Sequence, residues 1–301
     1  MSIKEEKDII YYYAKPSESI EEYNKKVVEI YKNRDYMSWI VYIETVNRCN
    51  STCNFCPVSV GNEKRPYMKM SEELFNKIIN DLVDIDYSRS IGLFLTNEPF
   101  LDDRIIEFAK IAKTKLPKAR LEILTNGSVF TLEKFKESYK YFDYIHINNY
   151  SDDDKLHKNV QEIYDFCKQN PQYIDKTYIA KRKLNEFLST RGGNVPNRKE
   201  SLQTLPYLCY LPIVQFPIRP DGKVSLCCCD TYGQMTLGDV NTTSIKDIWN
   251  SETYKKINEL MLKGRENLEI CKYCDYLDML PYSQGHKIAD TFNLYTNLLK
   301  Q

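Results

Sequence analysis

Between residues 39 and 181 the sequence alternates short apolar, β-rich runs with longer segments of helical periodicity. Strands that alternate with helices of this length indicate βαβ units and a parallel sheet, because parallel neighbours need a crossover segment between them. Five expected strands suit an α/β fold with an open, partial TIM-like barrel better than a closed barrel of eight strands. The expected strands span 39–43, 91–95, 121–124, 144–147 and 177–181, and the expected helices span 71–83, 104–114, 132–139 and 154–168.

After about residue 205 the pattern changes to a cysteine-rich segment with one expected hairpin and one expected helix. The hairpin spans 216–226 around a Pro-Asp-Gly turn, and the helix spans 244–263. A small cysteine-rich domain is therefore expected beside the barrel. The predicted parts are a helical lead-in over 1–38 with a helix at 20–32, a barrel over 39–204, the cysteine-rich domain over 205–280 and a helical tail over 281–301.

Composition excludes several classes of protein. The 42 lysines and arginines balance 42 aspartates and glutamates, so no overall charge favours nucleic acid or an anionic membrane. No apolar run approaches the roughly 18 residues of a membrane span. The first ten residues also lack the apolar region of a secretion signal. We therefore expect a cytoplasmic protein that acts on a small molecule or a peptide.

The chain has 10 cysteines against 3 histidines, and in a reducing compartment such a set indicates metal or redox chemistry before disulfides. Cys49, Cys53 and Cys56 lie in the loop after the first expected strand. Three thiolates there can bind three irons of a cubane and leave the fourth iron without a protein ligand. Structural zinc is the alternative, but neither a fourth cysteine nor a histidine lies close in sequence.

A second group of cysteines lies in the C-terminal part. It comprises Cys209, the run Cys227-Cys228-Cys229 and the pair Cys271-x-x-Cys274. Taken alone, a pair with this spacing is the half-site that zinc uses most often. The residues themselves therefore leave zinc and an iron–sulfur cluster open at this second group.

The cysteine triplet, with Phe55 directly before its last member, resembles the signature of the radical S-adenosylmethionine (SAM) superfamily, and the likeness extends over 42–191. This resemblance implies that SAM chelates the open iron and is cleaved to a 5′-deoxyadenosyl radical, with Phe55 against its adenine. The segment Asn97-Glu98-Pro99 resembles the family motif that receives the SAM ammonium through its glutamate; Asn97 stands where the family usually has glycine. Asn126, in Thr-Asn-Gly after the third strand, belongs to another recurring segment that contacts SAM.

The C-terminal part resembles the SPASM/Twitch extension of the same family, in its shorter Twitch form. The resemblance implies that Cys209, Cys227, Cys271 and Cys274 close a second [4Fe–4S] cluster with no open iron. Their spacing is similar to that of family members that dehydrogenate an aminocyclitol. Cys228 and Cys229 are expected to be thiols that pack in the core. Alternatively, Cys228 donates a hydrogen atom, because on a strand its side chain would point to the face opposite that of its two neighbours.

The resemblance also implies a function. We expect a radical SAM oxidoreductase that oxidises a secondary alcohol of a sugar or aminocyclitol, with the second cluster accepting an electron. The alternative is a radical SAM epimerase or a maturase that modifies a ribosomal peptide. Arg191, in the segment before Cys209, is the candidate substrate ligand, because the resemblance implies an arginine that contacts the substrate here. Its pKa is too high for it to act as a base, so it would position the substrate and stabilise negative charge on the substrate oxygen. His146 is expected to be a packed strand residue. A flavodoxin or ferredoxin is the expected electron donor.

Overall fold

The structure is a computed structural model that describes residues 19–32, 37–186, 188–198 and 204–277. The expected helix of the N-terminal lead-in is confirmed as α2 (Ile20–Lys32). The predicted C-terminal tail over 281–301 lies outside the described residues, as do 1–18 of the lead-in.

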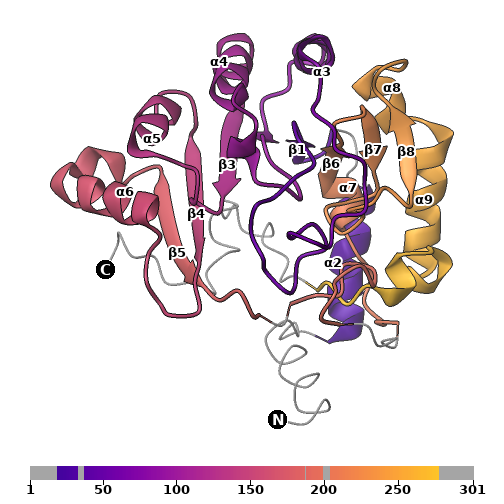
Figure 1. The fold of residues 1–301 in the computed structure, drawn as a ribbon. Helices are drawn as coiled ribbons and strands as arrows, with labels where there is room; N and C mark the ends of the chain where they lie inside the picture. The colour runs from indigo at the N-terminus through magenta and orange to yellow at the C-terminus, as the bar shows by residue number, and fades with distance from the viewer. Residues whose placement is uncertain (1–18, 33–36, 187, 199–203, 278–301) are drawn as a thin grey trace.

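The strands form one sheet in the order β5-β4-β3-β2-β1-β6-β7-β8 (Figure 1). Strands β1 to β5 are parallel, as the alternation of elements predicts. In this order β5 and β8 are the two ends, so the described strands form an open sheet and not a closed barrel. The strands are β1 (Ile40–Ile43), β2 (Ser90–Gly92), β3 (Arg120–Thr125), β4 (Tyr144–Tyr150), β5 (Thr177–Arg182), β6 (Gln215–Ile218), β7 (Lys223–Ser225) and β8 (Thr236–Asp239).

Four helices cover one side of the parallel strands: α3 (Glu72–Asp84), α4 (Ile105–Lys115), α5 (Leu132–Ser138) and α6 (Lys158–Gln169) (Figure 1). Their apolar faces are buried; Phe75 of α3 stacks on Phe108 of α4 with ring centroids 4.1 Å apart. Helix α6 begins four residues later than expected, because Asp154 has a left-handed backbone (φ 61°) that a helix cannot include. None of the described helices is long and apolar enough to cross a membrane.

The expected hairpin is confirmed as β6 and β7, which are antiparallel. Strand β6 also pairs with β1 in parallel, from Ile40 opposite Gln215 to Ile43 opposite Ile218. The sequence did not predict this pairing. The sheet therefore continues from the barrel into the cysteine-rich part, and one hydrophobic core includes residues of both.

The C-terminal part differs from the expectation in two further ways. Strand β8, which the sequence analysis did not predict, pairs with β7. The single helix expected over 244–263 is two helices, α8 (Ile245–Trp249) and α9 (Glu252–Lys263). Ser251 separates them because its backbone is extended and its side chain accepts a hydrogen bond from the Tyr254 N–H, which starts a new helix. A short helix, α7 (Leu211–Val214), precedes β6.

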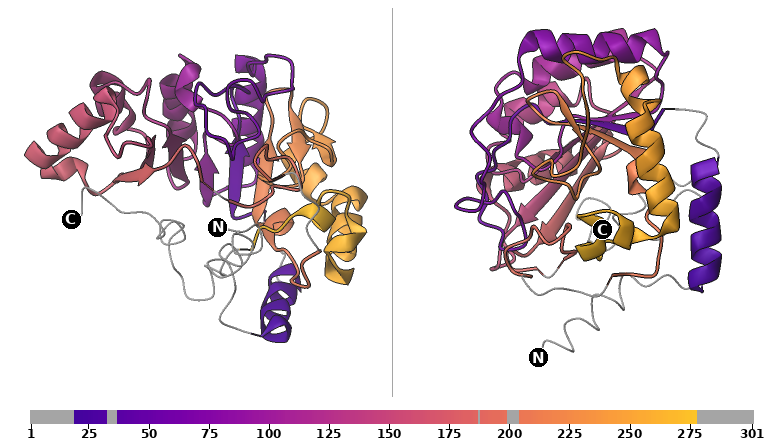
Figure 2. Two further views of the ribbon diagram at one scale, coloured as in Figure 1. Left: turned by 60° about the horizontal axis from the view of Figure 1, so that its bottom comes forward. Right: turned by 90° about the vertical axis from the view of Figure 1, so that its right-hand side faces the viewer.

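Helix α2 packs against the C-terminal part, although it lies at the other end of the described sequence (Figure 2). The hydroxyl of Tyr31 donates to the carbonyl of Cys209 over 2.8 Å. Asn24 bonds the backbone of Pro206 and of Leu208. The lead-in helix therefore holds the segment that carries the first cysteine of the second group.

Candidate active site

An open cavity lies at the carboxyl ends of the barrel strands and encloses about 590 Å³, part of it continuous with solvent. This is the end of the strands at which barrel enzymes place their chemistry. The residues predicted for the first cluster, for SAM and for the substrate all line this one cavity. Its walls are Cys49, Ser51, Cys53, Phe55, Cys56, Val58, Ser59, Leu95, Thr96, Asn97, Glu98, Leu124, Thr125, Asn126, Asn148, Tyr150 and Arg191.

The cysteine triplet (Cys49, Cys53 and Cys56) lies in the loop after β1, and Cys53 is buried while the other two are half-buried. Burial raises the pKa of Cys49 to about 12 and that of Cys53 to about 11. These thiols therefore stay protonated until a metal displaces the proton. Ser51 Oγ lies 3.0 Å from Cys53 Sγ and is a polar neighbour that the sequence analysis missed.

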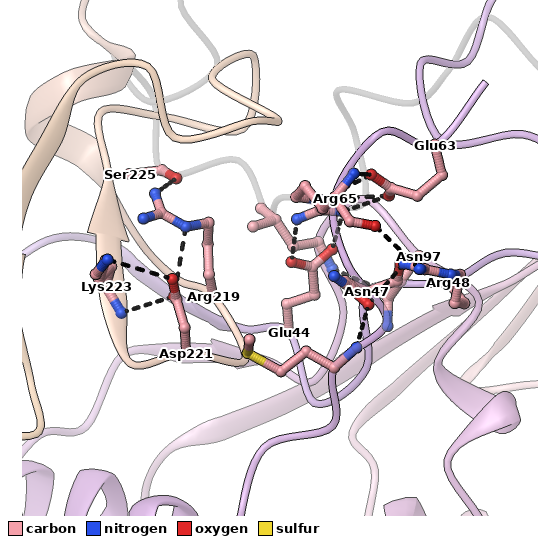
Figure 3. A network of polar contacts seen from close by, with 12 residues as sticks. Glu44, Asn47, Arg48, Glu63, Arg65, Asn97, Arg219, Asp221, Lys223 and Ser225 are labelled. Atoms are coloured by element: carbon pink, nitrogen blue, oxygen red, sulfur yellow. Dashed lines mark hydrogen bonds and ion pairs between the residues drawn. The ribbon is translucent and has the colours of Figure 1, made fainter.

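The loop that follows the triplet, residues 57–69, is connected to the end of β1 by ion pairs and hydrogen bonds (Figure 3). Arg65 forms ion pairs of 2.8 Å with Glu44 and 2.9 Å with Glu63. The Arg48 guanidinium donates to the Arg65 carbonyl over 3.0 Å. Burial raises the pKa of Glu44 to about 7, although Arg65 opposes this. These contacts fix both sides of the cysteine loop.

Glu98 is fully buried, and its carboxylate accepts three hydrogen bonds. The donors are the Thr125 hydroxyl at 2.7 Å, the Asn126 N–H at 2.7 Å and the Phe100 N–H at 3.1 Å. Burial raises the pKa of Glu98 to about 7 against these bonds. A carboxylate has about four acceptor positions, so one remains for a ligand. The sequence analysis missed the structural role, in which Glu98 ties the end of β3 to the loop after β2.

The two asparagines predicted to contact SAM also line the cavity. Asn97 has no left-handed backbone, so the glycine usual at this position is not required here. Its Oδ1 accepts from the Leu95 N–H at 3.0 Å, while its buried Nδ2 has no hydrogen-bond partner among the described residues. Asn126 Nδ2 lies 2.8 Å from Asn50 Oδ1 and 3.8 Å from Cys49 Sγ.

Phe55 is buried at the cavity wall. Its ring centroid lies 5.8 Å from that of Tyr150, and the Arg182 guanidinium lies 5.5 Å from the same ring. Two further residues, Asn148 and Tyr150, line the cavity from β4. The sequence analysis did not predict them as site residues. An alternating strand puts both on one face, and that pattern could have identified them.

Arg191 reaches the same cavity from the segment after β5 and has a left-handed backbone (φ 45°). Asp275 and Tyr273 hold this turn: the Thr190 N–H donates to Asp275 Oδ1 over 2.6 Å, and the Thr190 hydroxyl donates to the Tyr273 carbonyl over 2.7 Å. Gly192 follows with φ 64°, and a Cβ there would lie 3.1 Å from Ile270. The turn that carries Arg191 is therefore built against the second group of cysteines.

The electrostatics of Arg191 reflect this position. Burial alone would lower the pKa of its guanidinium, but the thiols of Cys56, Cys228 and Cys229 outweigh burial and raise it. Arg191 thus lies between a cysteine of the triplet and the second group of cysteines. Among the described residues its side chain has no carboxylate partner.

The four cysteines predicted as ligands of a second cluster are all buried: Cys209, Cys227, Cys271 and Cys274, called here the C-terminal cysteine set. They act on one another electrostatically, so their thiols lie close together. Burial raises the pKa of Cys209 to about 12. The pKa of Cys274 falls to about 6, first because Cys229 bonds it and also because the Gly192 N–H does so.

Cys227, Cys228 and Cys229 do not lie on a strand, because β7 ends at Ser225. The expectation that Cys228 faces away by strand alternation is therefore wrong. A turn places these residues instead, and the Cys228 N–H donates to Gln215 Oε1 over 2.9 Å. The thiols of Cys227, Cys228 and Cys274 all act electrostatically on the thiol of Cys229, so it lies against the C-terminal cysteine set.

His146 lies on β4 and is completely buried, with its ring centroid 4.8 Å from that of Tyr178. Burial, and then the charge of Arg182, lower its pKa to about 3. The imidazole is therefore neutral, as expected for a packed strand residue.

The chemistry of the two cysteine groups fits iron–sulfur clusters. In each the converging donors are thiols, which suit iron–sulfur clusters. In the part of the chain that the structure describes, no three cysteine, histidine or acidic side chains are placed to hold a single metal ion.

Two family profiles match the sequence. The radical SAM superfamily matches residues 43–177, and the iron–sulfur cluster-binding domain SPASM matches residues 209–275. Among characterised proteins, the S-adenosyl-L-methionine-dependent 2-deoxy-scyllo-inosamine dehydrogenase of Niallia circulans is 23% identical over 247 residues, covering 80% of this chain and 94% of that protein.

Solved structures share the fold. The crystal structure of BtrN with AdoMet and 2-DOIA has a TM-score of 0.70 at 21% identity, covering 81% of this chain and 96% of that one. Native anSMEcpe with bound AdoMet has a TM-score of 0.54 at 12% identity, covering 74% and 83%. SuiB of Streptococcus suis, bound to the precursor peptide SuiA, has a TM-score of 0.50 at 14% identity, covering 83% and 74%.

The two profiles define the class of the chain: it carries a radical SAM domain over 43–177 and a C-terminal SPASM domain over 209–275. These two domains imply that its cofactors are SAM and [4Fe–4S] clusters. The predicted superfamily, fold class and cofactors are thereby confirmed.

Proposed function

We propose that this enzyme dehydrogenates a secondary alcohol of an aminocyclitol or a related sugar. The observation that carries this proposal is the place of Arg191, which lies in the cavity of the triplet while the preceding residue, Thr190, is hydrogen-bonded to the two neighbours of Cys274 in sequence. A substrate bound at Arg191 would lie next to both cysteine groups. The Niallia circulans relative, whose name states a dehydrogenase of an aminocyclitol, supports this reaction and substrate class.

The cofactor ligands are part of the proposal. The triplet of Cys49, Cys53 and Cys56 would hold the first cluster, because it lines an open cavity that leaves room for SAM at the fourth iron. The C-terminal cysteine set would hold the second, here called the auxiliary cluster, because its four buried thiols leave no open position. Bound SAM and its cluster supply a carbon-centred radical that removes a hydrogen atom.

The chain's residues would orient SAM in this cavity. Glu98 would accept the SAM ammonium at its remaining acceptor position, and the free Nδ2 of Asn97 would donate to the SAM carboxylate. Phe55, held between Tyr150 and Arg182, would pack on the adenine. Asn126 would orient the cluster loop through its contact with Cys49.

Arg191 would bind the substrate oxygen and stabilise negative charge on it. In the complete reaction the substrate carbon loses a hydrogen atom, its hydroxyl loses a proton to a base, and one electron leaves toward the C-terminal cysteine set. The guanidinium stays protonated throughout, since its neighbours raise its pKa. The turn fixed by Asp275 would keep the guanidinium at that place.

Product mass tests the reaction. The purified holoenzyme is incubated with SAM, a reductant and candidate aminocyclitols or sugars, and we expect a product two hydrogens lighter than its substrate. Iron and sulfide analysis should give about eight of each per chain, as for two cubanes. A product of unchanged mass that gains one deuterium from heavy water would contradict the dehydrogenase assignment.

One observation favours a second candidate, epimerisation of a sugar or of a peptide residue. Cys228 is half-buried and lies close enough to Arg191 for that charge to act on its thiol, so a substrate held by Arg191 would lie near a hydrogen-atom donor. An epimerase would lose its product with Cys228→Ala, whereas we expect the dehydrogenase to lose little activity.

We further propose a flavodoxin or ferredoxin as the electron donor to the first cluster. We place the enzyme in the cytoplasm, because its free thiols and clusters need a reducing compartment.

A further inference from the structure

Arg265 is the most deeply buried arginine of the described residues, with 1% of its surface exposed. It lies in a short 3₁₀ turn, Arg265–Asn267, after α9. Its guanidinium donates to three backbone carbonyls: Tyr207 at 2.7 Å, Cys274 at 3.0 Å and Tyr276 at 2.8 Å. All three acceptors are neutral, so they satisfy the N–H groups but do not neutralise the charge.

The two other buried arginines of the described residues have a carboxylate partner. Arg198 pairs with Asp275, and Arg219 pairs with Asp221. No described carboxylate pairs with Arg265. An isolated charge in the interior is strongly unfavourable, so a buried cation without a carboxylate indicates another anionic group beside it.

The C-terminal cysteine set provides that group. The Arg265 guanidinium donates to the carbonyl of Cys274 itself over 3.0 Å. It also donates over 2.7 Å to the carbonyl of Tyr207, two residues before Cys209, so its charge lies beside the segments that carry these cysteines. A cubane held by four thiolates carries net negative charge. When it accepts an electron, it gains one further negative charge.

We propose that Arg265 is the counter-charge of the auxiliary cluster and raises its reduction potential, so that the cluster can accept the electron released by the substrate. A fixed positive charge nearby stabilises the reduced cluster more than the oxidised one, because the reduced form is more negative. The inference rests on the proposed function, since it takes the C-terminal cysteine set as the ligands. Arg265 touches neither the cavity nor the triplet, so it acts as a positioning and electrostatic residue.

The test is a redox titration followed by electron paramagnetic resonance. In a Cys49→Ala, Cys53→Ala, Cys56→Ala background only the auxiliary cluster can form, and its potential is compared between Arg265 and Arg265→Met. We expect at least a tenfold lower ratio of reduced to oxidised cluster at a fixed potential, which corresponds to a shift of about 59 mV for one electron. Arg265→Lys keeps the positive charge, so the reduction potential of its auxiliary cluster should stay near that of the parent. Arg219→Met, which removes a buried but carboxylate-paired arginine of the same part, is the matched control and should leave the potential unchanged.

Each outcome is decisive. An unchanged potential in Arg265→Met overturns the inference. If Arg265→Met fails to bind the cluster, cluster binding by Arg265→Lys would support the role of Arg265 as a counter-charge. If neither variant binds the cluster, the hydrogen bonds to the carbonyls matter and the charge does not, and the inference is overturned. If the parent background itself holds no cluster, the proposed function fails instead. The two failures are therefore distinguishable.

Discussion

The two groups of cysteines lie within one protein but in opposite surroundings. The triplet lies in a single loop of eight residues, 49–56, and two of its three thiols are half-exposed to an open cavity. The C-terminal cysteine set comes from three separate segments, and all four thiols are buried. A buried arginine without a carboxylate lies beside the second group.

This difference separates two tasks. An open site can admit SAM and release products, whereas a closed site beside a fixed cation can only exchange electrons. Arg191 lies between the two groups, and the turn that carries it is hydrogen-bonded to Tyr273 and Asp275, on either side of Cys274. The structure therefore links the position of Arg191 to the closed site, and each of the following experiments disturbs one side of this arrangement.

The largest effect is expected from removing the open site. Replacing Cys49, Cys53 and Cys56 together with Ala should reduce SAM cleavage to background while about half of the iron and its visible absorbance remain. The measurement is 5′-deoxyadenosine formation with iron analysis. Cys167→Ala is the control, because this buried cysteine of α6 belongs to neither group and both clusters should persist. Deoxyadenosine formation in the triple variant would refute the ligand assignment.

The next largest effect is expected between the two sites. Arg191→Met should lower product formation by roughly 10- to 100-fold, the loss of one charge-assisted hydrogen bond worth about 1.5–3 kcal/mol. SAM cleavage should continue, so deoxyadenosine would form without oxidised product. Arg191→Lys should recover part of the activity. If the formation of deoxyadenosine and of oxidised product fell together, Arg191 would contact SAM and not the substrate.

A smaller effect is expected within the open site. Glu98→Gln should weaken SAM binding about tenfold, since the neutral amide loses the charge-assisted bond to the SAM ammonium. Glu122→Gln is the matched control: this carboxylate is also buried, on β3, but it pairs with Ser90 and Arg120 and does not line the cavity. Equal SAM affinities of both variants and the parent would move the ammonium contact elsewhere.

The last expected effect concerns the stability of the fold and not the reaction. His146 has a folded pKa of about 3, so between pH 6.5 and 3 the unfolded state binds the extra proton and stability falls as pH falls. At pH 5 the loss should be about 2 kcal/mol relative to neutral pH. Thermal or denaturant unfolding of the parent and of His146→Gln measures it, and His157→Gln, at an exposed position, is the control. An identical pH dependence in all three would show that His146 is hydrated.

Much of the barrel could be predicted from the sequence, because helical and strand periodicity is set by residues within a few positions of one another. The parallel order of β1 to β5 follows from that alternation. The short strand β8 and the division between α8 and α9 could not be found in the same way. Strand β8 and the break between the two helices each involve only three or four residues, too few for a clear periodicity. Ser251 begins α9 because its backbone is extended in the folded chain.

The site followed the same division. The spacing of the triplet and of Cys271 and Cys274 is local, so the sequence by itself predicted thiolate sites for metal, and the resemblance of the triplet to the radical SAM signature predicted SAM. The pairing of β6 with β1 joins segments about 175 residues apart, and it brings the second group of cysteines to the barrel. The meeting of Arg265 with Tyr207, 58 residues away, and of Thr190 with Asp275, 85 residues away, depends on that packing. Only the tertiary structure decided these contacts, because whether a charge is buried and what lies beside it depends on every segment that excludes water from it.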